Sequence, residues 1–112
     1  MRYIKYTKNK ILIFNDPKKA ANGADVIFSD KVISMNDKVD KIKKLLNFKK
    51  FKINEKLMSY AKKDCIFLHC LPRGTEVDEK VFTSNQSKVW EQASNRVHVQ
   101  KSILLYCFSK LR

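Results

Sequence analysis

The sequence has few glycines, few prolines and no long apolar run. With 2 Gly and 2 Pro among 112 residues, it has little of the turn chemistry of a β-sandwich or of a flexible linker. Apolar runs such as residues 11–14 and 103–105 are far shorter than the about 20 residues that cross a bilayer. No long apolar stretch follows the first five residues, as a signal peptide requires. We therefore expect a soluble, cytoplasmic chain with one compact core and no membrane partner.

Acidic residues are also scarce. The chain has 11 Asp and Glu against 24 Lys and Arg, a formal net charge of +13. That charge suits a nucleic-acid-binding module, with lysines acting beside Phe48, Phe51 and Tyr60. Only 4 of the basic residues are Arg, however, and Arg is the side chain that makes paired hydrogen bonds to bases and phosphates. The scattered lysines favour a solvated helix surface, and nucleic-acid binding remains the alternative.

The three cysteines cannot all pair within one chain, so reduced thiols are expected. Cys65 and His69 would share one face of a predicted strand, while Cys70 has the opposite parity. Side chains on opposite faces do not converge on one ion. The sequence therefore predicts no metal site.

Strand-like and helix-like segments alternate along the chain. Apolar segments predict strands at 11–14, 24–30 and 65–69, and residues 88–91 are a candidate for a fourth strand. Cap residues and helical spacing predict helices at about 17–22 after Asp16, at 38–46, from Asn54 to Lys62, from Asp78 to Phe82, and from about Ser94 to the carboxyl terminus. This alternation favours an α/β fold with an open, mostly parallel sheet of about four strands, flanked by helices.

Two chemically useful side chains follow predicted strands. Asp30 comes directly after the second strand and Cys70 directly after the third. In an open parallel sheet, ligands bind at the carboxyl ends of the strands. Considered singly, Cys70 would more often be a small buried residue, and Asp30 a cap or loop residue. The pair at adjacent strand ends favours a site.

Four segments carry a family resemblance. Residues 24–30 (ADVIFSD), Ser34-Met35-Asn36, residues 69–72 (HCLP) and residues 94–101 (SNRVHVQK) follow one another in order. They resemble the A-D-V-I-Y-T-D, S-M-G, H-C-L-P and E-N-R-x-H-x-x-K segments of the ornithine carbamoyltransferases. The resemblance runs from about Ile11 to the end of the chain.

The resemblance implies specific roles. Asp30, Ser34 and Met35 would bind ornithine. Cys70 and Leu71 would lie between its side chain and the carbamoyl group, and Arg96 would contact carbamoyl phosphate. Asp30, Cys70 and Arg96 would thus be the catalytic residues. The implied reaction gives citrulline and phosphate without any cofactor.

The same resemblance implies a partial protein. Residues 1–112 would be part of the second, ornithine-binding domain, a Rossmann-like sheet with a long C-terminal helix. The S-T-R-T-R segment of the carbamoyl phosphate domain is absent. The full-length enzyme would be a homotrimer, and the isolated chain would be marginally folded or aggregation-prone, and inactive.

The sequence also departs from the family pattern. Asn36 replaces the Gly of S-M-G, Val32 replaces a Trp, and Ser94 replaces the Glu of E-N-R. Asn is the non-glycine residue that best adopts a left-handed conformation, so the loop can be retained. These changes leave open another acceptor amine, such as putrescine or acetylornithine.

Overall fold

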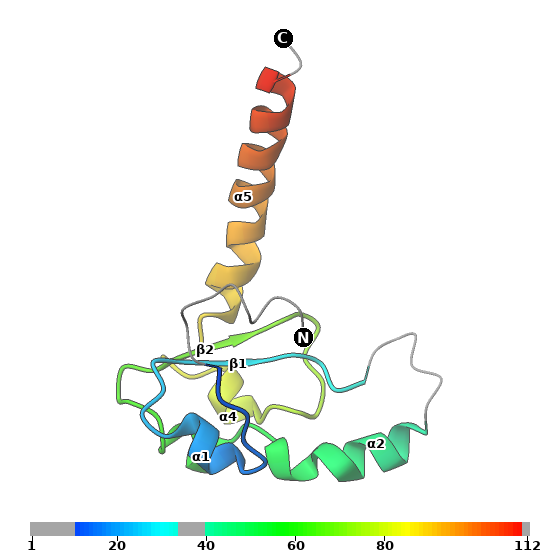
Figure 1. The fold of residues 1–112 in the computed structure, drawn as a ribbon, viewed down its shortest axis with the longest axis vertical. Coiled ribbons are helices and arrows are strands. Elements are labelled where there is room, and N and C mark those ends of the chain that lie inside the picture. The colour runs from blue at the N-terminus through cyan, green and yellow to red at the C-terminus, as the bar shows by residue number, and fades with distance from the viewer. Residues whose placement is uncertain (1–10, 34–39, 111–112) are drawn as a thin grey trace.

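The computed structural model describes residues 11–33 and 40–110. In chain order the elements are α1 (Pro17–Ala21), β1 (Val26–Ser29), α2 (Lys41–Phe48), the 3-10 turn η2 (Lys49–Phe51), α3 (Glu55–Met58), β2 (Ile66–His69), α4 (Glu79–Phe82) and α5 (Val89–Lys110). Figure 1 shows a small α/β body from which α5 projects. No helix in this described part combines the length and apolarity that crossing a membrane would need.

The sheet is parallel and small. β1 pairs with β2 in the register Val26↔Ile66 to Ser29↔His69. Along β2 the side chains alternate, so that Phe67 is fully buried and His69 is 1% exposed. They lie beside a core formed by Ala21, Ile27, Ile53, Leu57, Met58, Cys65, Val77, Val81, Phe82 and Val89. The predicted α/β class with a parallel sheet is confirmed, with two strands rather than about four among the described residues.

Local capping chemistry fixes several boundaries as predicted. The Asp16 carboxylate accepts a hydrogen bond from the Lys18 N–H and caps α1. Asn54 does the same for α3 through the Leu57 N–H, at 2.8 Å. After α1 the chain turns at Gly23, whose φ of 67° favours glycine. Asp78 stands at the start of α4, as expected, but without a side-chain capping bond.

Two predicted strands are wrong. Residues 11–14 form no strand, and Ile13 is 76% exposed. Residues 88–91 open α5 instead of forming a strand. The pairing beside β2 falls slightly earlier, because Phe67 N donates to Gln86 O and Lys88 N donates to Phe67 O. These two hydrogen bonds form a single parallel bridge between Phe67 and Ser87. α5 then begins at Val89, five residues before the predicted start at Ser94.

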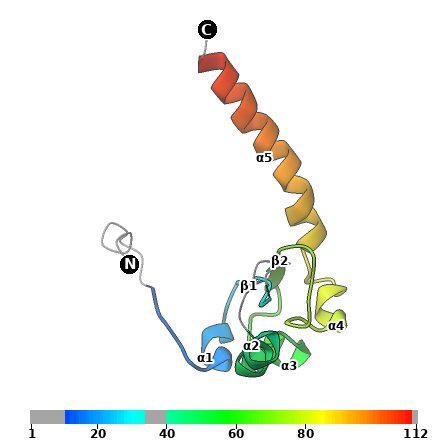
Figure 2. The ribbon, with the colours of Figure 1, turned by 90° about the vertical axis from the view of Figure 1, so that its right-hand side faces the viewer.

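The predicted helices also differ in length. α2 begins at Lys41 and ends at Phe48, and α3 ends at Met58 rather than at Lys62. α5 projects away from the α/β body, and its carboxyl-terminal end is the part farthest from the body (Figures 1 and 2). Val89 in its first turn is fully buried, whereas every residue from 93 to 110 is exposed. Its attachment includes the Gln92 side chain, which accepts a hydrogen bond from the His69 N–H.

Candidate active site

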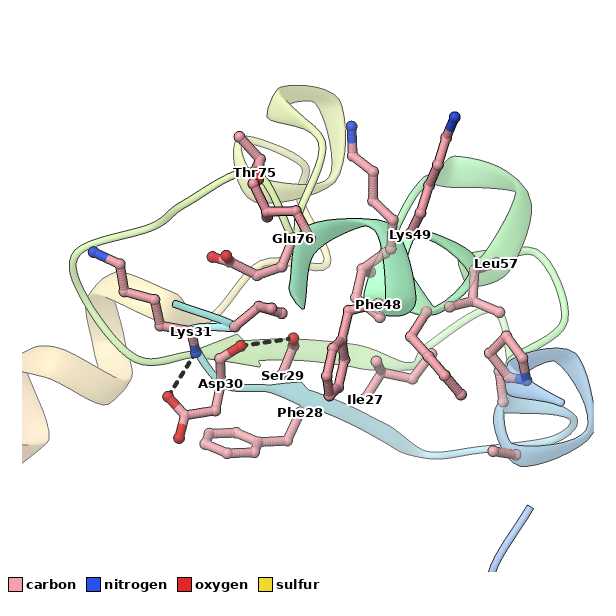
Figure 3. A pocket seen from close by; sticks show the side chains of 18 of the residues that line it. Ile27, Phe28, Ser29, Asp30, Lys31, Phe48, Lys49, Leu57, Thr75 and Glu76 are labelled. Carbon is pink, nitrogen blue, oxygen red and sulfur yellow. Dashed lines mark hydrogen bonds between the residues drawn. The ribbon is translucent and has the colours of Figure 1, made fainter. Parts of the chain in front are cut away.

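Asp30 and Cys70 meet at the carboxyl ends of β1 and β2. Because Ser29 lies opposite His69 in the ladder, the next residue of each strand emerges at the same edge. The Cys70 thiol donates a hydrogen bond to Oδ1 of Asp30 at 2.7 Å. The same oxygen accepts from the Lys31 N–H at 2.6 Å (Figure 3). The sequence-based expectation that these two side chains lie together is confirmed, although their roles stay predictions.

The hydrogen bond shifts the pKa values of Asp30 and Cys70 in opposite directions. The Cys70 thiol, together with the Lys31 N–H, holds the pKa of Asp30 below its usual value. The Asp30 carboxylate, assisted by partial burial, raises the pKa of Cys70. The stable state of the pair near neutral pH is therefore a carboxylate beside a protonated thiol. Asp30, not Cys70, is the group able to accept a proton or hold an ammonium.

This assignment predicts an order of thiol reactivity. Because only the thiolate is alkylated readily, we expect iodoacetamide to modify exposed Cys107 several-fold faster than Cys70 near pH 8. Buried Cys65, whose pKa burial raises, should react slowest. Mass spectrometry of peptides from the native chain measures all three rates. Faster labelling of Cys70 than of Cys107 would show a thiolate at this position.

A buried contact between a histidine and a carboxylate supports the loop that follows Cys70. His69 Nε2 lies 3.0 Å from Oε1 of Glu76, and the two side chains are 0% and 6% exposed. His69 Nδ1 contacts the Cys70 carbonyl oxygen. Since both partners are acceptors, both contacts are hydrogen bonds only when the ring carries two N–H groups. The expectation that His69 is a core residue is confirmed by its burial.

Glu76 was not singled out from the sequence. Its Oε1 also accepts from the Gly74 N–H at 2.6 Å, and its backbone oxygen accepts from the Ile53 N–H. A Cβ at Gly74 would lie 2.5 Å from Oε2 of Glu76, so a side chain at this position would displace the Glu76 carboxylate. The available signal was a carboxylate two residues after a glycine in the loop that follows a buried histidine.

Of the remaining predicted site residues, the structure describes Leu71 and Arg96. Ser34 and Met35 lie outside the described residues. Leu71 follows Cys70, joined to Pro72 by a cis peptide bond, and is 42% exposed. Arg96 lies on α5 one helical turn beyond Gln92, and its side chain is exposed. Within the described part of the chain, Arg96 makes no ion pair.

A cavity of about 910 Å³ opens beside the pair. Asp30, Lys31 and Glu76 line it at one end, and apolar side chains such as Ile27 and Phe48 line it further along (Figure 3). It thus places polar groups next to apolar walls, as small-molecule sites do. Among the described residues, no three His, Cys, Asp or Glu side chains converge as a metal site would require.

Comparison with known proteins agrees with this geometry. The ornithine carbamoyltransferase of Methanococcus maripaludis strain C5 is 49% identical over 107 residues, covering 93% of this chain and 35% of the relative. That of Nitratiruptor is 44% identical, covering 95% and 35%. The crystal structure of the anabolic ornithine carbamoyltransferase of Campylobacter jejuni superposes with a TM-score of 0.75 at 38% identity, over 85% of this chain and 32% of that one.

A second structural neighbour is the ornithine carbamoyltransferase of Pyrococcus furiosus, with a TM-score of 0.72 and 44% identity over 80% of this chain and 29% of that chain. The chain thus spans about a third of the length of the relatives it matches. The sequence pattern described as "Aspartate/ornithine carbamoyltransferase, Asp/Orn binding domain" matches residues 1–107, nearly the whole chain. With that match added to the two strand-end residues and the superposed structures, the chain belongs to the aspartate/ornithine carbamoyltransferase family.

Proposed function

We propose that this chain forms part of an ornithine carbamoyltransferase that transfers the carbamoyl group of carbamoyl phosphate to the δ-amine of L-ornithine. The products are L-citrulline and phosphate, a step of arginine biosynthesis. The observation that carries the proposal is the 2.7 Å contact between Cys70 and Asp30 at neighbouring strand ends. The relatives' shared name supports the same reaction.

The reaction needs a carboxylate close to the amine. An alkyl ammonium has a pKa near ~10.4, so only about one part in a thousand is neutral near pH 7.4. Only the neutral amine attacks, and freeing it from its proton is a task of roughly 4 kcal/mol at about 1.36 kcal/mol per pKa unit. Oδ2 of Asp30 has no hydrogen-bond partner within the described residues. It is therefore open to an amine and to its proton.

The other assignments extend the same proposal. Ser34 and Met35 would hold the amino-acid end of ornithine beside Asp30. Leu71 would contact the carbamoyl group, and the Arg96 guanidinium would stabilise negative charge on carbamoyl phosphate. The carbamoyl phosphate domain would come from the rest of the protein, which would assemble as a cytoplasmic homotrimer.

A chimera tests the reaction. In the chimera, residues 1–107 of this chain replace the matched region of the Methanococcus maripaludis enzyme. The matched region is 35% of that enzyme's length. We expect the purified chimera to form citrulline from ornithine and carbamoyl phosphate, and the 112-residue chain alone to form none. Putrescine and acetylornithine are supplied as competing acceptors. A folded chimera that prefers either acceptor would overturn the assignment to ornithine.

Cys70 is tested in the same chimera. Cys70→Ala removes the thiol that orients the Asp30 carboxylate, and hydrogen bonds to charged groups are worth about 1.5–3 kcal/mol. We expect kcat/KM to fall by about tenfold to a hundredfold, since 1.4 kcal/mol is a factor of about ten. The exposed Cys107→Ala variant is the matched control and should keep full activity. Equal rates for both variants would remove Cys70 from the mechanism.

A further inference from the structure

The outer edge of β2 is closed by the segment that leads into α5. Phe67 N donates to Gln86 O at 2.8 Å, and Lys88 N donates to Phe67 O at 2.9 Å. The next N–H group on this edge belongs to His69, two residues further along the strand. It donates to Oε1 of Gln92 at 3.1 Å. Because buried backbone N–H groups need a partner, this side chain occupies the place of a neighbouring strand.

Gln92 stands where the contact between α5 and the body ends. α5 leaves the body beside β2 (Figure 1), and Val89 in its first turn is fully buried. The Trp90 ring meets the Phe82 ring edge-on at 5.9 Å. Gln92 is half-buried, whereas every residue from 93 to 110 is exposed. Apolar burial is not directional, but a hydrogen bond is, so the Gln92 hydrogen bond fixes the rotation of α5 about its axis.

Arg96 shares the helix face of Gln92. The two residues are four positions apart, so their Cβ atoms lie about 5–6 Å apart on the same side of the helix. The partner of Gln92 is the backbone of His69, and Cys70 follows His69 directly. A rotation of α5 by one residue, about 100°, would turn Arg96 away from the carboxyl end of β2. One hydrogen bond thus links the orientation of Arg96 to the strand end that carries Cys70.

We propose that Gln92 is a positioning residue for carbamoyl phosphate, which holds Arg96 towards the carboxyl end of β2. The inference rests on the proposed function, because that function supplies the anion that Arg96 would contact. Gln92 itself touches no substrate and acts through Arg96. A side chain that is ordered before binding loses less conformational entropy when its ligand arrives. Loss of the Gln92 hydrogen bond should therefore weaken the binding of carbamoyl phosphate more than that of ornithine.

Gln92→Leu in the chimeric enzyme tests the inference. Leucine is a good helix former and has no acceptor for the His69 N–H. We expect the Kd of carbamoyl phosphate, measured by calorimetry, to rise by about threefold to tenfold, the range for loss of one neutral hydrogen bond. The KM of ornithine at saturating carbamoyl phosphate should stay within about twofold. Equal rises in both constants, or no rise in the first, would overturn the proposal.

Gln86→Leu is the matched control. The Gln86 side chain donates to Cys65 O at 3.0 Å, at the opposite end of β2, so this change also removes a side-chain hydrogen bond beside the strand. Thermal unfolding should show similar destabilisation of both variants, while only Gln92→Leu raises the Kd of carbamoyl phosphate. A similar rise for Gln86→Leu would make Gln92 a structural residue only. Gln92→Glu keeps an acceptor oxygen and should bind carbamoyl phosphate more tightly than Gln92→Leu, and the reverse order would contradict the proposal.

A double-mutant cycle decides whether Gln92 acts through Arg96. Arg96→Gln should raise the Kd of carbamoyl phosphate, and adding Gln92→Leu should then change it by less than about twofold, because the side chain to be oriented is gone. Additive effects of the two changes would overturn the proposal. Failure of the proposed function is distinguishable, since a chimera that binds carbamoyl phosphate but forms no citrulline lacks the reaction and still permits this cycle. A chimera that does not bind carbamoyl phosphate would overturn both.

Discussion

Asp30→Asn in the chimeric enzyme is expected to lower kcat/KM for citrulline formation by about a hundredfold to ten thousandfold, the range for loss of a positioned acid–base group. Asparagine keeps the shape of the side chain and one acceptor oxygen, so the Lys31 N–H and the Cys70 thiol retain a partner. What disappears is the negative charge. The variant therefore separates proton and ammonium binding from simple positioning, and a steady-state assay of citrulline measures the difference.

Asp25 offers a matched control for this change. It stands at the opposite end of β1, with a side chain 73% exposed and paired with Lys62 at 2.6 Å. Exposed pairs of this kind contribute about 0–1 kcal/mol. Asp25→Asn should therefore leave the citrulline rate within about twofold, since it removes the same charge from the same strand far from the site. Comparable losses of citrulline formation in both variants would mean that Asp30 acts only through its contribution to the net charge of the chain.

Glu76→Ala is expected to destabilise the chimera by about 1–3 kcal/mol, because it leaves the buried His69 ring without its hydrogen-bond partner. It also removes the acceptor for the Gly74 N–H, so the loop after Cys70 loses a stabilising hydrogen bond. Thermal unfolding measures the change. Glu55→Ala, which removes an exposed carboxylate paired with Lys80 at 3.3 Å, is the control and should cost about 1 kcal/mol at most. Equal effects would show that the Glu76 pair contributes no more than a surface pair.

The contribution of the Glu76 carboxylate to the free energy of unfolding should depend on pH in a defined direction. Burial raises the pKa of Glu76, but the N–H groups of Gly74, Glu76 and Val32 and the charge of His69 lower it by more, so the net value lies below the usual one. A depressed carboxyl pKa adds stability above the unfolded value, about 4.3, and that stability is lost as the pH falls through the folded value. The stability gap between wild type and Glu76→Gln should therefore narrow on acidification below pH 4.3. A gap that widens there would contradict a charged Glu76.

The elements that the sequence predicted well have local causes. Continuous apolar segments identified β1 and β2, as is typical of parallel strands, although Val26 and Phe28 of β1 are exposed. Asp16, Asn54 and Gly23 marked helix ends because a cap acts within a few residues. The meeting of Asp30 and Cys70 followed from the parallel register, since carboxyl ends of parallel strands share one edge.

The features that the sequence did not predict depend on distant partners. Ile11–Phe14 has the composition of a strand, but a strand requires a neighbour, and none lies beside it in the described residues. Residues 88–91 contain Val89 and Trp90, which suit a strand, but the Gln92 contact with His69 and the burial of Val89 favour the start of α5. Glu76 was missed because its partner is a histidine that only the folded loop brings within 3.0 Å.

Among the described residues, two neutral donors already occupy Oδ1 of Asp30, so the proposed amine substrate would find Oδ2 open. In the proposed reaction, the cationic nitrogen of ornithine would donate a charge-assisted hydrogen bond to Oδ2, because the donor and the acceptor are both ionised. In the proposed reaction, the same nitrogen leaves as an uncharged amide of citrulline, and its bond to the oxygen is weaker. Capture of the substrate and release of the product would then both depend on the charge of one nitrogen.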